Sequence, residues 1–222
     1  MNKNNEIELK FEVLDEINLI KFLNSLKYID KIKISDYYFD TKNADLFNKG
    51  IFIRIRNKSR LDFKFNKDHF YKHKSYCLHD FCDELSFDMP LKPKDTIKIN
   101  NICSILNLNK IKKADFSHFK LINNLIKSVI INKTRKSYTD DIFHYYLDNV
   151  KNLGKYLEIE YLSCNKGYID EIKNKMLKKI SNLKVKHINI GYNEIYYRKY
   201  NLNIYLKGLY LLEEDYKKYR IN

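Results

Sequence analysis

Strict alternation of apolar and polar residues recurs along the chain and predicts β-strands. In NEIELKF, near the start, Glu6, Glu8 and Lys10 share one face, because successive side chains of a strand point to opposite sides. The later segment YLEIEYL repeats the pattern with Glu158 and Glu160. A strand of this kind usually buries its apolar face and exposes the charged one, which is the simplest interpretation of each strand taken alone.

The same alternation predicts further strands, and apolar residues at helical spacing predict helices between them. Asp15 is placed to cap the first helix, because its side chain can accept a hydrogen bond from the next turn of backbone. We predict strands at residues 31–40, 50–57, 60–66, 82–91, 127–138, 141–150 and 154–163, and helices at 15–26, 95–108 and 169–180. The pattern leaves 115–125 unassigned and makes 191–201 either helical or irregular.

No segment rich in glycine, serine or proline divides the 222 residues, so we expect one α+β domain, residues 1–222. Its core is expected at about 5–200, with roughly eight antiparallel strands flanked by helices, and 201–222 as a tail. A hydrophobic content of 44% excludes a disordered chain. No apolar run is long enough to span a bilayer, the first residues lack the features of a secretion signal, and the four cysteines form no disulfide framework. We therefore expect a cytoplasmic protein with no membrane partner.

The net charge of +14 indicates an anionic partner. Nucleic acid is one interpretation, because an excess of lysine and arginine is its usual signature. Most of the excess is lysine, however, and it accompanies many Asn, Ile and Tyr residues, whose codons are rich in A and T. Genome composition therefore explains part of the charge, and the charge alone does not identify the anion.

The polar faces of the predicted strands carry repeated charges, where a solvated face would mix Ser, Thr, Asn and Lys. Besides the two glutamate pairs, these faces present Arg54, Arg56, Asp62, Lys64, Lys133, Arg135 and Asp148. A closed barrel with these faces turned inward would gather carboxylates and cations in a water-filled bore. Crowded carboxylates repel unless a divalent cation such as Mg²⁺ or Mn²⁺ lies between them, and arginine and lysine bind phosphate oxygens. A bore that binds metal and phosphate is therefore the hypothesis that competes with solvated faces.

The segments that carry these charges resemble the CYTH superfamily, the triphosphate tunnel metalloenzymes, which include thiamine triphosphatases, inorganic triphosphatases and class IV adenylyl cyclases. EIELK is similar to the family's Glu-x-Glu-x-Lys signature, YYFDT to its second-strand motif, FIRIR to its paired-arginine strand and LDFKF to its lysine strand. TRKSY, LDNVKNLGKYLEIE and GYNEI match the second half in order, so the resemblance covers about residues 5–200. The chain departs from the pattern in HDFCDEL, where Cys82 takes the place of an arginine that often precedes the glutamate equivalent to Glu84.

The resemblance implies a closed antiparallel barrel of eight strands, flanked by helices, whose tunnel binds a triphosphate-containing small molecule and acts with Mg²⁺ or Mn²⁺. By position, the residues expected to hold the phosphates are Lys10, Arg54, Arg56, Lys64, Lys133 and Arg135. The expected metal ligands are Glu6, Glu8, Glu84, Asp148, Glu158 and Glu160. Glu6, Glu8 and Lys10 form the expected catalytic group, in which the two glutamates serve a second metal or the attacking water.

Three functions remain open at this stage. Hydrolysis of a triphosphate is preferred because it needs the fewest parts. A cyclase that makes cyclic AMP and pyrophosphate from ATP would also need a pocket for adenine and ribose, which nothing in the sequence identifies. A non-catalytic module that binds polyphosphate, nucleotide or an RNA 5′ end has no use for the acidic residues. Apart from an RNA 5′ end, we expect no nucleic-acid partner.

Two other patterns have simpler interpretations. His69, His73, Cys77, His79 and Cys82 form a short run of potential zinc ligands, but their spacing matches no common zinc finger and predicts scattered surface residues. The tyrosines of YNEIYYRKY could stack on a base or plug the end of the tunnel, although packing of the tail onto the barrel is the preferred interpretation.

Overall fold

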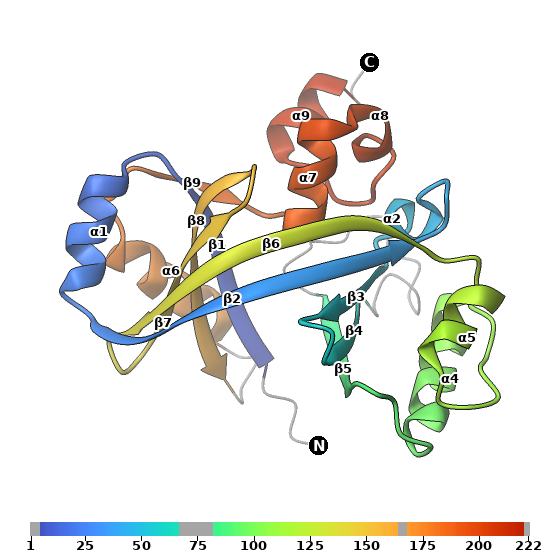
Figure 1. Cartoon of the computed structure of the whole chain (residues 1–222). Coiled ribbons are helices and arrows are strands. Elements are labelled where there is room, and N and C mark those ends of the chain that lie inside the picture. The colour runs from blue at the N-terminus through green and yellow to red at the C-terminus, as the bar shows by residue number, and fades with distance from the viewer. Residues whose placement is uncertain (1–4, 67–81, 164–167, 220–222) are drawn as a thin grey trace. The chain divides into compact units, whose positions relative to one another are not determined.

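A computed structural model describes residues 5–66, 82–163 and 168–219 of the chain (Figure 1). Its strands are β1 (Asn5–Val13), β2 (Lys27–Asp40), β3 (Phe52–Arg56), β4 (Arg60–Phe65), β5 (Asp83–Asp88), β6 (Ile126–Thr139), β7 (His144–Val150), β8 (Gly154–Ser163) and β9 (Val185–Ile188). Its helices are α1 (Glu16–Asn24), α2 (Asp45–Asn48), α4 (Asp95–Leu106), α5 (Phe116–Ile122), α6 (Ile169–Lys179), α7 (Tyr192–Tyr200), α8 (Leu202–Tyr205) and α9 (Glu213–Tyr219). None of these described helices is long and apolar enough to cross a membrane.

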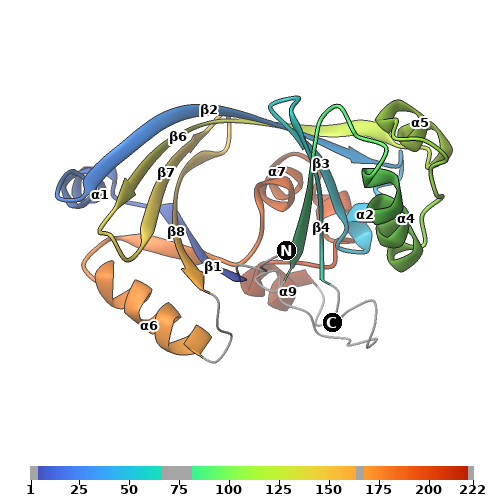
Figure 2. The same ribbon diagram turned by 90° about the horizontal axis from the view of Figure 1, so that it is seen from below.

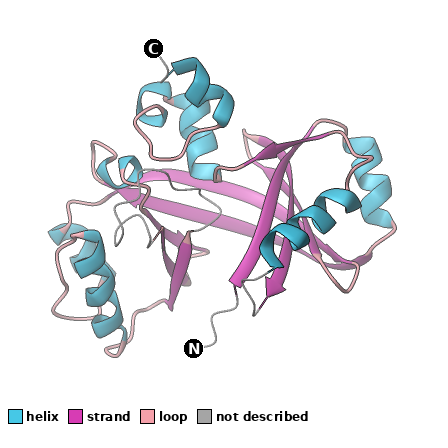
Figure 3. Cartoon of the chain, turned by 180° about the vertical axis from the view of Figure 1, so that it is seen from behind, coloured by secondary structure: helices cyan, strands magenta, loops and turns pink. Residues whose placement is uncertain are grey.

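The described strands, drawn in magenta in Figure 3, form one nine-stranded antiparallel sheet. Their order in the sheet is β5-β4-β3-β2-β6-β7-β8-β1-β9. The predicted class, α+β with helices and an antiparallel sheet, is confirmed. The predicted closed barrel of eight strands needs correction, because β9 adds a strand by pairing with β1 from Lys10 to Val13. Within the described residues the sheet keeps two edges, β5 and β9, so its closure into a barrel is not confirmed.

The chain forms two compact units. The first contains residues 1–34 and 132–189, and the second contains residues 35–131 and 190–222. The division falls within β2 and β6, so each of these long strands contributes one part to each unit.

The first unit has its core on the apolar faces of β1, β7 and β8, against which α1 and α6 pack (Figure 1). Leu9 of β1, Ile159 of β8 and Met176 of α6 are buried there together with Leu19 of α1. The predicted cap of α1 is confirmed, because the side chain of Asp15 accepts a hydrogen bond from the backbone N–H of Asn18 at 3.2 Å. Alternation in the strands thus sends apolar residues to the helices and leaves the opposite faces to polar residues.

The second unit buries the apolar faces of β3, β4 and β5 against α4 and α5 (Figure 2). Phe63 of β4 lies at the centre and packs edge-on against Phe119 of α5, with ring centroids 5.8 Å apart. The segment 115–125, which the sequence pattern left unassigned, contains α5. This helix begins after Asp115, whose carboxylate accepts the backbone N–H groups of Ser117 and His118 at 2.8 and 3.2 Å.

The C-terminal helices belong to the second unit and are packed into it. Tyr197 of α7 lies edge-on to Phe47, with 4.7 Å between the ring centroids. Gly208 approaches the same phenylalanine so closely that an added Cβ would lie 2.5 Å from its ring. Arg198 and Asp215 connect α7 to α9 through two hydrogen bonds of 2.6 and 3.1 Å. The tyrosine-rich segment is therefore helical, and Tyr197 packs it against α2 within the second unit.

Candidate functional site

In the first unit, strand register gathers the predicted charged residues on one face. Across β1 and β8, Glu8 lies directly opposite Glu160 and Lys10 lies directly opposite Glu158. Residues directly opposite in an antiparallel pair have their Cβ atoms about 5 Å apart and share a face. Four residues predicted from the sequence are therefore neighbours in the structure.

Asp148 of β7 binds two cationic side chains of this face, Lys133 and Arg135. It has no exposed surface and lies directly opposite Arg135 of β6. Arg135 donates to its two carboxylate oxygens at 2.8 and 2.7 Å, and the ammonium group of Lys133 donates to it as well. Burial lowers the pKa of Lys133, although the charges of Glu158 and Asp148 oppose this shift.

Glu158 connects this anchor to β1. It accepts a hydrogen bond from Arg135, and its other oxygen lies 3.3 Å from Nζ of Lys10. The same Nζ atom lies 3.3 Å from Glu8. Arg135 reaches Glu160 only at 4.0 Å, and its guanidinium group lies 4.3 Å from the ring centre of Tyr146. The first unit therefore holds an alternating network of acids and bases.

Among the described residues, no group of three or more His, Cys, Asp or Glu side chains is close enough to hold a metal ion. A pair of carboxylates nevertheless suits Mg²⁺, which usually takes one or two protein carboxylates and completes its shell with water and substrate phosphates. Glu8 and Glu160 are such a pair by register. Glu8 lies 3.3 Å from Nζ of Lys10, and Glu160 lies 4.0 Å from Nη1 of Arg135.

In the second unit, register builds a similar network on β2 to β5. Asp36 of β2 lies directly opposite Arg56 of β3, and Arg54 of β3 lies directly opposite Asp62 of β4. Arg56 donates through Nε and Nη2 to the two oxygens of Asp36, both at 2.8 Å. Asp36 and Asp62 are each only 1% exposed, so these carboxylates form the floor of the cluster.

Arg54 is the centre of this second cluster. Its Nε and Nη2 atoms donate to Asp62 at 3.0 and 2.8 Å, and Nη2 also donates to Glu84 of β5 at 3.1 Å. Burial alone would lower the pKa of Arg54, but the charge of Asp36, with those of neighbouring acids, raises it well above its ordinary value. Burial likewise would lower the pKa of Arg56, whose hydrogen bonds to Asp36 raise it instead. Both guanidinium groups therefore stay charged at every physiological pH.

The model of the CYTH domain matches residues 4–190. The chain belongs to the CYTH family. Its structure is similar to that of a Pyrococcus horikoshii protein, at 22% identity and a TM-score of 0.55, covering 87% of this chain and 99% of that one. At this identity the likeness shows the fold alone. No curated protein matches the chain.

Two other similar structures carry functional descriptions. A Hippeastrum protein is described as a candidate adenylyl cyclase with a dominant triphosphatase activity; it is 15% identical, with a TM-score of 0.56, over 90% of this chain and 97% of its own. A Vibrio parahaemolyticus protein is described as a candidate adenylate cyclase; it is 13% identical, with a TM-score of 0.55, over 86% of this chain and 97% of its own. These descriptions apply to those proteins, and the likeness again shows the shared CYTH fold.

The CYTH residues predicted from the sequence fall into two sets, one in each unit. The set of the first unit consists of residues that contact one another or are paired by register: Glu8, Lys10, Lys133, Arg135, Asp148, Glu158 and Glu160. The set of the second unit lies on one face of its strands and consists of Arg54, Arg56, Lys64 and Glu84. Glu84 accepts from Arg54 and Arg60 rather than from Lys64, although Lys64 lies directly opposite it. Glu6 lies on β1, the strand of Glu8 and Lys10 in the first unit, but its side chain is outside the described part of the structure.

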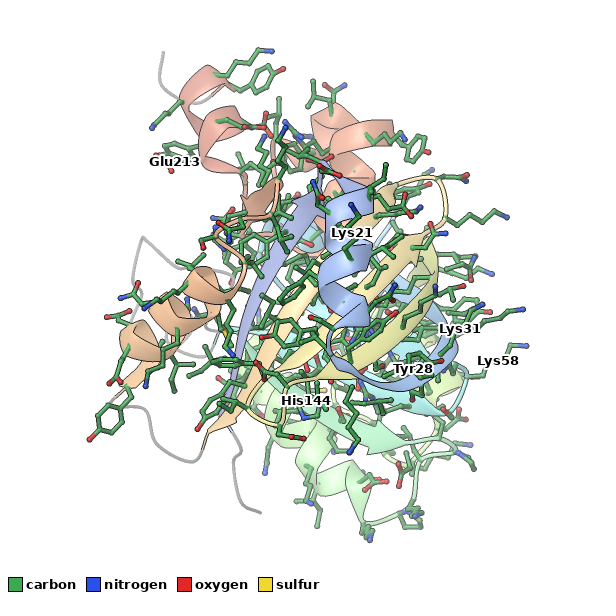
Figure 4. The ribbon with its side chains drawn as sticks, turned by 90° about the vertical axis from the view of Figure 1, so that its left-hand side faces the viewer. Lys21, Tyr28, Lys31, Lys58, His144 and Glu213 are labelled. Carbon is green, nitrogen blue, oxygen red and sulfur yellow. The ribbon has the colours of Figure 1, made fainter. Side chains whose placement is uncertain are left out.

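Sequence reasoning missed several residues of the two clusters. Asp36 and Arg60 were not assigned any role, and Asp62 was noted only as a charge on a polar face. The signal was present, because Asp36, Tyr38 and Asp40 alternate just as the glutamates do. His144 was also missed. It begins β7 directly opposite Glu160, at the edge of the charged face (Figure 4).

The potential zinc ligands do not gain support from the structure. His69, His73, Cys77 and His79 lie outside the described residues. Cys82 is a free thiol that donates to the hydroxyl of Tyr210, with 3.5 Å between the two atoms. Burial raises the pKa of this thiol to about 11, so it stays protonated at neutral pH and lacks the thiolate that binds zinc.

Proposed function

We propose that this CYTH protein is a divalent-metal-dependent triphosphatase, acting on inorganic tripolyphosphate, thiamine triphosphate or a nucleoside triphosphate. The observation that carries the proposal is the cluster of the second unit, where two buried aspartates hold Arg54 and Arg56 side by side on one sheet face. The description of the Hippeastrum protein as mainly a triphosphatase supports hydrolysis over cyclisation.

The arginines of the second unit would hold the phosphates. Asp36 engages Nε and Nη2 of Arg56, so the Nη1 group of this arginine has no carboxylate within hydrogen-bond distance among the described residues. Lys64 likewise makes no ion pair within the described part of the chain. When a carboxylate binds one edge of a guanidinium group, the N–H groups of the other edge point in a fixed direction. A guanidinium edge of this kind binds phosphate oxygens in pairs. The buried aspartates therefore orient the cations that receive the substrate.

The carboxylates of the first unit are the proposed metal ligands. Glu8 and Glu160, with Glu158 and Glu6, would hold Mg²⁺ or Mn²⁺, a metal that can neutralise phosphate charge and activate water. Nζ of Lys10 lies 3.3 Å from both Glu8 and Glu158, where the ammonium group can also face a phosphate oxygen. Asp148 orients Arg135 for the same purpose. Positioning and charge stabilisation account for most of the rate of phosphoryl transfer, so these are the roles that matter.

Phosphorus NMR tests the proposal directly. The purified protein is incubated with Mg²⁺ or Mn²⁺ and, separately, with tripolyphosphate, thiamine triphosphate and ATP, with EDTA as the metal-free control. We expect orthophosphate to appear only with metal. Pyrophosphate together with cyclic AMP from ATP would instead identify a cyclase, and no turnover of any substrate would leave a binding module.

A double substitution tests the metal ligands. We expect Glu158→Gln with Glu160→Gln to fold normally and to lose metal-dependent turnover by at least about a hundredfold, because neutral amides are poor ligands for hard cations. Glu171→Gln is the matched control, since Glu171 is an exposed glutamate of α6 paired only with Lys175 among the described residues. Full activity of the double variant would contradict the assignment.

Replacing the central arginine tests the phosphate-binding role. Arg54→Ala should raise the dissociation constant for tripolyphosphate about 10- to 100-fold, the cost of losing hydrogen bonds to a charged group. Lys58→Ala removes one positive charge from the exposed turn between β3 and β4 and is expected to bind normally. Isothermal titration calorimetry in EDTA compares the two, and unchanged affinity of Arg54→Ala would contradict the role of the cluster.

A further inference from the structure

Two aromatic side chains of β7 lie on the charged face of the first unit. On this strand, Tyr145 and Leu147 are buried in the apolar core. The alternate positions His144, Tyr146 and Asp148 point to the opposite face, which carries the network of acids and bases. The rings of His144 and Tyr146 are half-buried, their planes differ by 12° and their centres lie 6.3 Å apart. Two nearly parallel rings therefore stand beside one another among charged groups.

The two rings border both kinds of group that the proposed function assigns to this unit. The guanidinium group of Arg135, a proposed phosphate ligand, lies over the ring of Tyr146, 4.3 Å from its centre. Arg135 is bound by Asp148, the next residue after Tyr146 on this face. His144, labelled in Figure 4, precedes Tyr146 and is directly opposite Glu160, a proposed metal ligand. The cation and the second ring thus flank Tyr146 from opposite directions along β7.

Packing of the sheet explains another tyrosine of this face but not this pair. Tyr156 of β8 is directly opposite Asp148 and only 2% exposed, and its hydroxyl donates to the backbone carbonyl of Leu153 at 3.2 Å. Its ring is covered and its polar atom is satisfied within the chain. His144 and Tyr146 instead keep part of their surface exposed, and neither belongs to the buried core of the unit. Flat apolar surface beside a few oriented polar groups is typical of a site that binds an organic ligand.

The chemistry of these rings selects one kind of ligand group. Aromatic side chains stack on flat heterocycles, and this stacking tolerates different heterocycles because each has a π-face. Since the planes of His144 and Tyr146 are nearly parallel, one flat ring can lie parallel to both. Inorganic tripolyphosphate has no group that could contact them in this way. A nucleoside triphosphate or thiamine triphosphate carries such a ring joined to the phosphates that Arg135 would bind.

We propose that His144 and Tyr146 form a binding platform for the aromatic ring of the substrate, so that the protein prefers a triphosphate carrying a flat heterocycle to inorganic tripolyphosphate. This inference rests on the proposed function and narrows its substrate class. Nucleobases and the rings of thiamine share the required chemistry, and the measurements that test the platform distinguish them.

Two substitutions of His144 test the platform. His144→Leu removes the ring and keeps an apolar side chain, whereas His144→Phe keeps a flat ring. The phosphorus NMR assay gives KM and kcat for ATP, thiamine triphosphate and tripolyphosphate. We expect His144→Leu to raise KM about 10-fold for the substrate whose ring stacks on the platform and to leave KM for tripolyphosphate unchanged. His144→Phe should keep KM near the wild-type value for all three, because the stacking surface remains.

His187→Leu is the matched control in the same unit. His187 of β9 is directly opposite Phe11, whose side chain lies in the apolar core, so His187 is on the other face of the sheet from the charged network. This variant should keep the wild-type KM for every substrate. An equal rise in KM for all three substrates in His144→Leu would show that His144 acts on the phosphates or the metal, and the platform would be wrong.

Proton NMR of the ligand detects the stacking itself and needs only the wild type. ATP and thiamine triphosphate are each titrated with the protein in EDTA, which prevents metal-dependent turnover. We expect the ring protons of one of them to shift upfield, because the ring currents of stacked aromatic side chains shield protons above their faces. If the phosphorus signals of both ligands shift while the ring protons of neither do, the platform is wrong, whether or not the variants of His144 fold.

The outcomes separate this inference from the proposed function. If the wild type hydrolyses tripolyphosphate with a kcat/KM at least as high as for ATP and thiamine triphosphate, the preference is wrong and the triphosphatase stands. If His144→Leu leaves KM unchanged for every substrate, the platform is wrong and the triphosphatase again stands. If the wild type neither binds nor hydrolyses any triphosphate, both proposals are wrong.

Discussion

Both units contain a buried aspartate that lies directly opposite an arginine on the neighbouring strand. Asp148 holds Arg135 in the first unit, and Asp36 holds Arg56 in the second, each through two hydrogen bonds of 2.7–2.8 Å. Isolated buried charges are costly, so such a pair persists only when its hydrogen bonds are nearly complete. The same carboxylate that offsets the burial cost also fixes the direction of the guanidinium group. Stability and the proposed binding of substrate thus depend on the same contacts.

Asp148→Asn tests this dependence. The substitution leaves Lys133, which is 5% exposed, and Arg135 without their shared counter-ion, so we expect the free energy of unfolding to fall by about 3–5 kcal/mol. Urea unfolding followed by circular dichroism measures the loss. Asp141→Asn is the control, because Asp141 is an exposed turn residue with φ of 69°, a conformation that asparagine tolerates. Equal stability of the two variants would show that Asp148 does not anchor the cations.

The sequence predicted many of the charged residues of the two clusters, but not their partners. Glu8, Lys10, Arg54 and Glu158 follow from alternation and from the CYTH resemblance. Asp36 was missed because its partner depends on register: only the pairing of β2 with β3 places it opposite Arg56. A single sequence contains the alternation along each strand, whereas the position of one strand relative to the next is a property of the folded sheet.

At the scale of elements, the same difference separates what was predicted from what was missed. Strands β1, β3, β4 and β8 have clear alternation, and their predicted bounds are close to the bounds in the structure. Strand β9 has only four residues with little alternation, and it is ordered as a strand by pairing with β1. Helix α5 is also short, and its apolar residues are fixed by contacts with β4 that lie far away in the sequence. Short elements of this kind depend on tertiary packing more than on local propensity.

The cap of α5 gives this element a pH dependence. The backbone N–H of His118, followed by that of Ser117, lowers the pKa of Asp115 below its ordinary value of 3.8. A carboxylate with a lowered pKa in the folded state stabilises the protein above pH 3.8 and loses this contribution as the pH falls through the lowered value. Asp115→Asn keeps a capping oxygen that does not titrate.

We therefore expect the urea midpoint of the wild type, relative to that of Asp115→Asn, to decrease between pH 6 and pH 3. Asp88→Asn provides the control, since Asp88 is an exposed carboxylate on β5 that caps no helix. A difference between wild type and Asp115→Asn that stays constant with pH would show that the cap does not titrate in this range.

At the scale of the whole molecule, the charge of +14 has two components with different salt dependence. Most lysines are exposed, as Figure 4 shows for Lys21, Lys31 and Lys58. At 0.1 M salt the attraction of such exposed charges for a polyanion decays over a Debye length of about 10 Å. The guanidinium groups of Arg54 and Arg56 are largely buried and fixed by aspartates, so salt screens them less. Binding to RNA in general and binding to a triphosphate should therefore respond differently to salt.

This difference tests the remaining alternative, a module that binds RNA 5′ ends. We expect an RNA with a 5′ hydroxyl to bind at 50 mM KCl and to lose at least about a hundredfold in affinity by 300 mM, because counterion release governs contacts with surface lysines. Affinity for tripolyphosphate should fall less over the same range, and Arg54→Ala should weaken it without affecting the hydroxyl-ended RNA. Fluorescence anisotropy of labelled RNA, with tripolyphosphate as competitor, measures both affinities. Tight, salt-resistant binding of 5′-triphosphate RNA without release of orthophosphate would favour the module, because the buried arginines would then bind the end of an RNA and not a substrate.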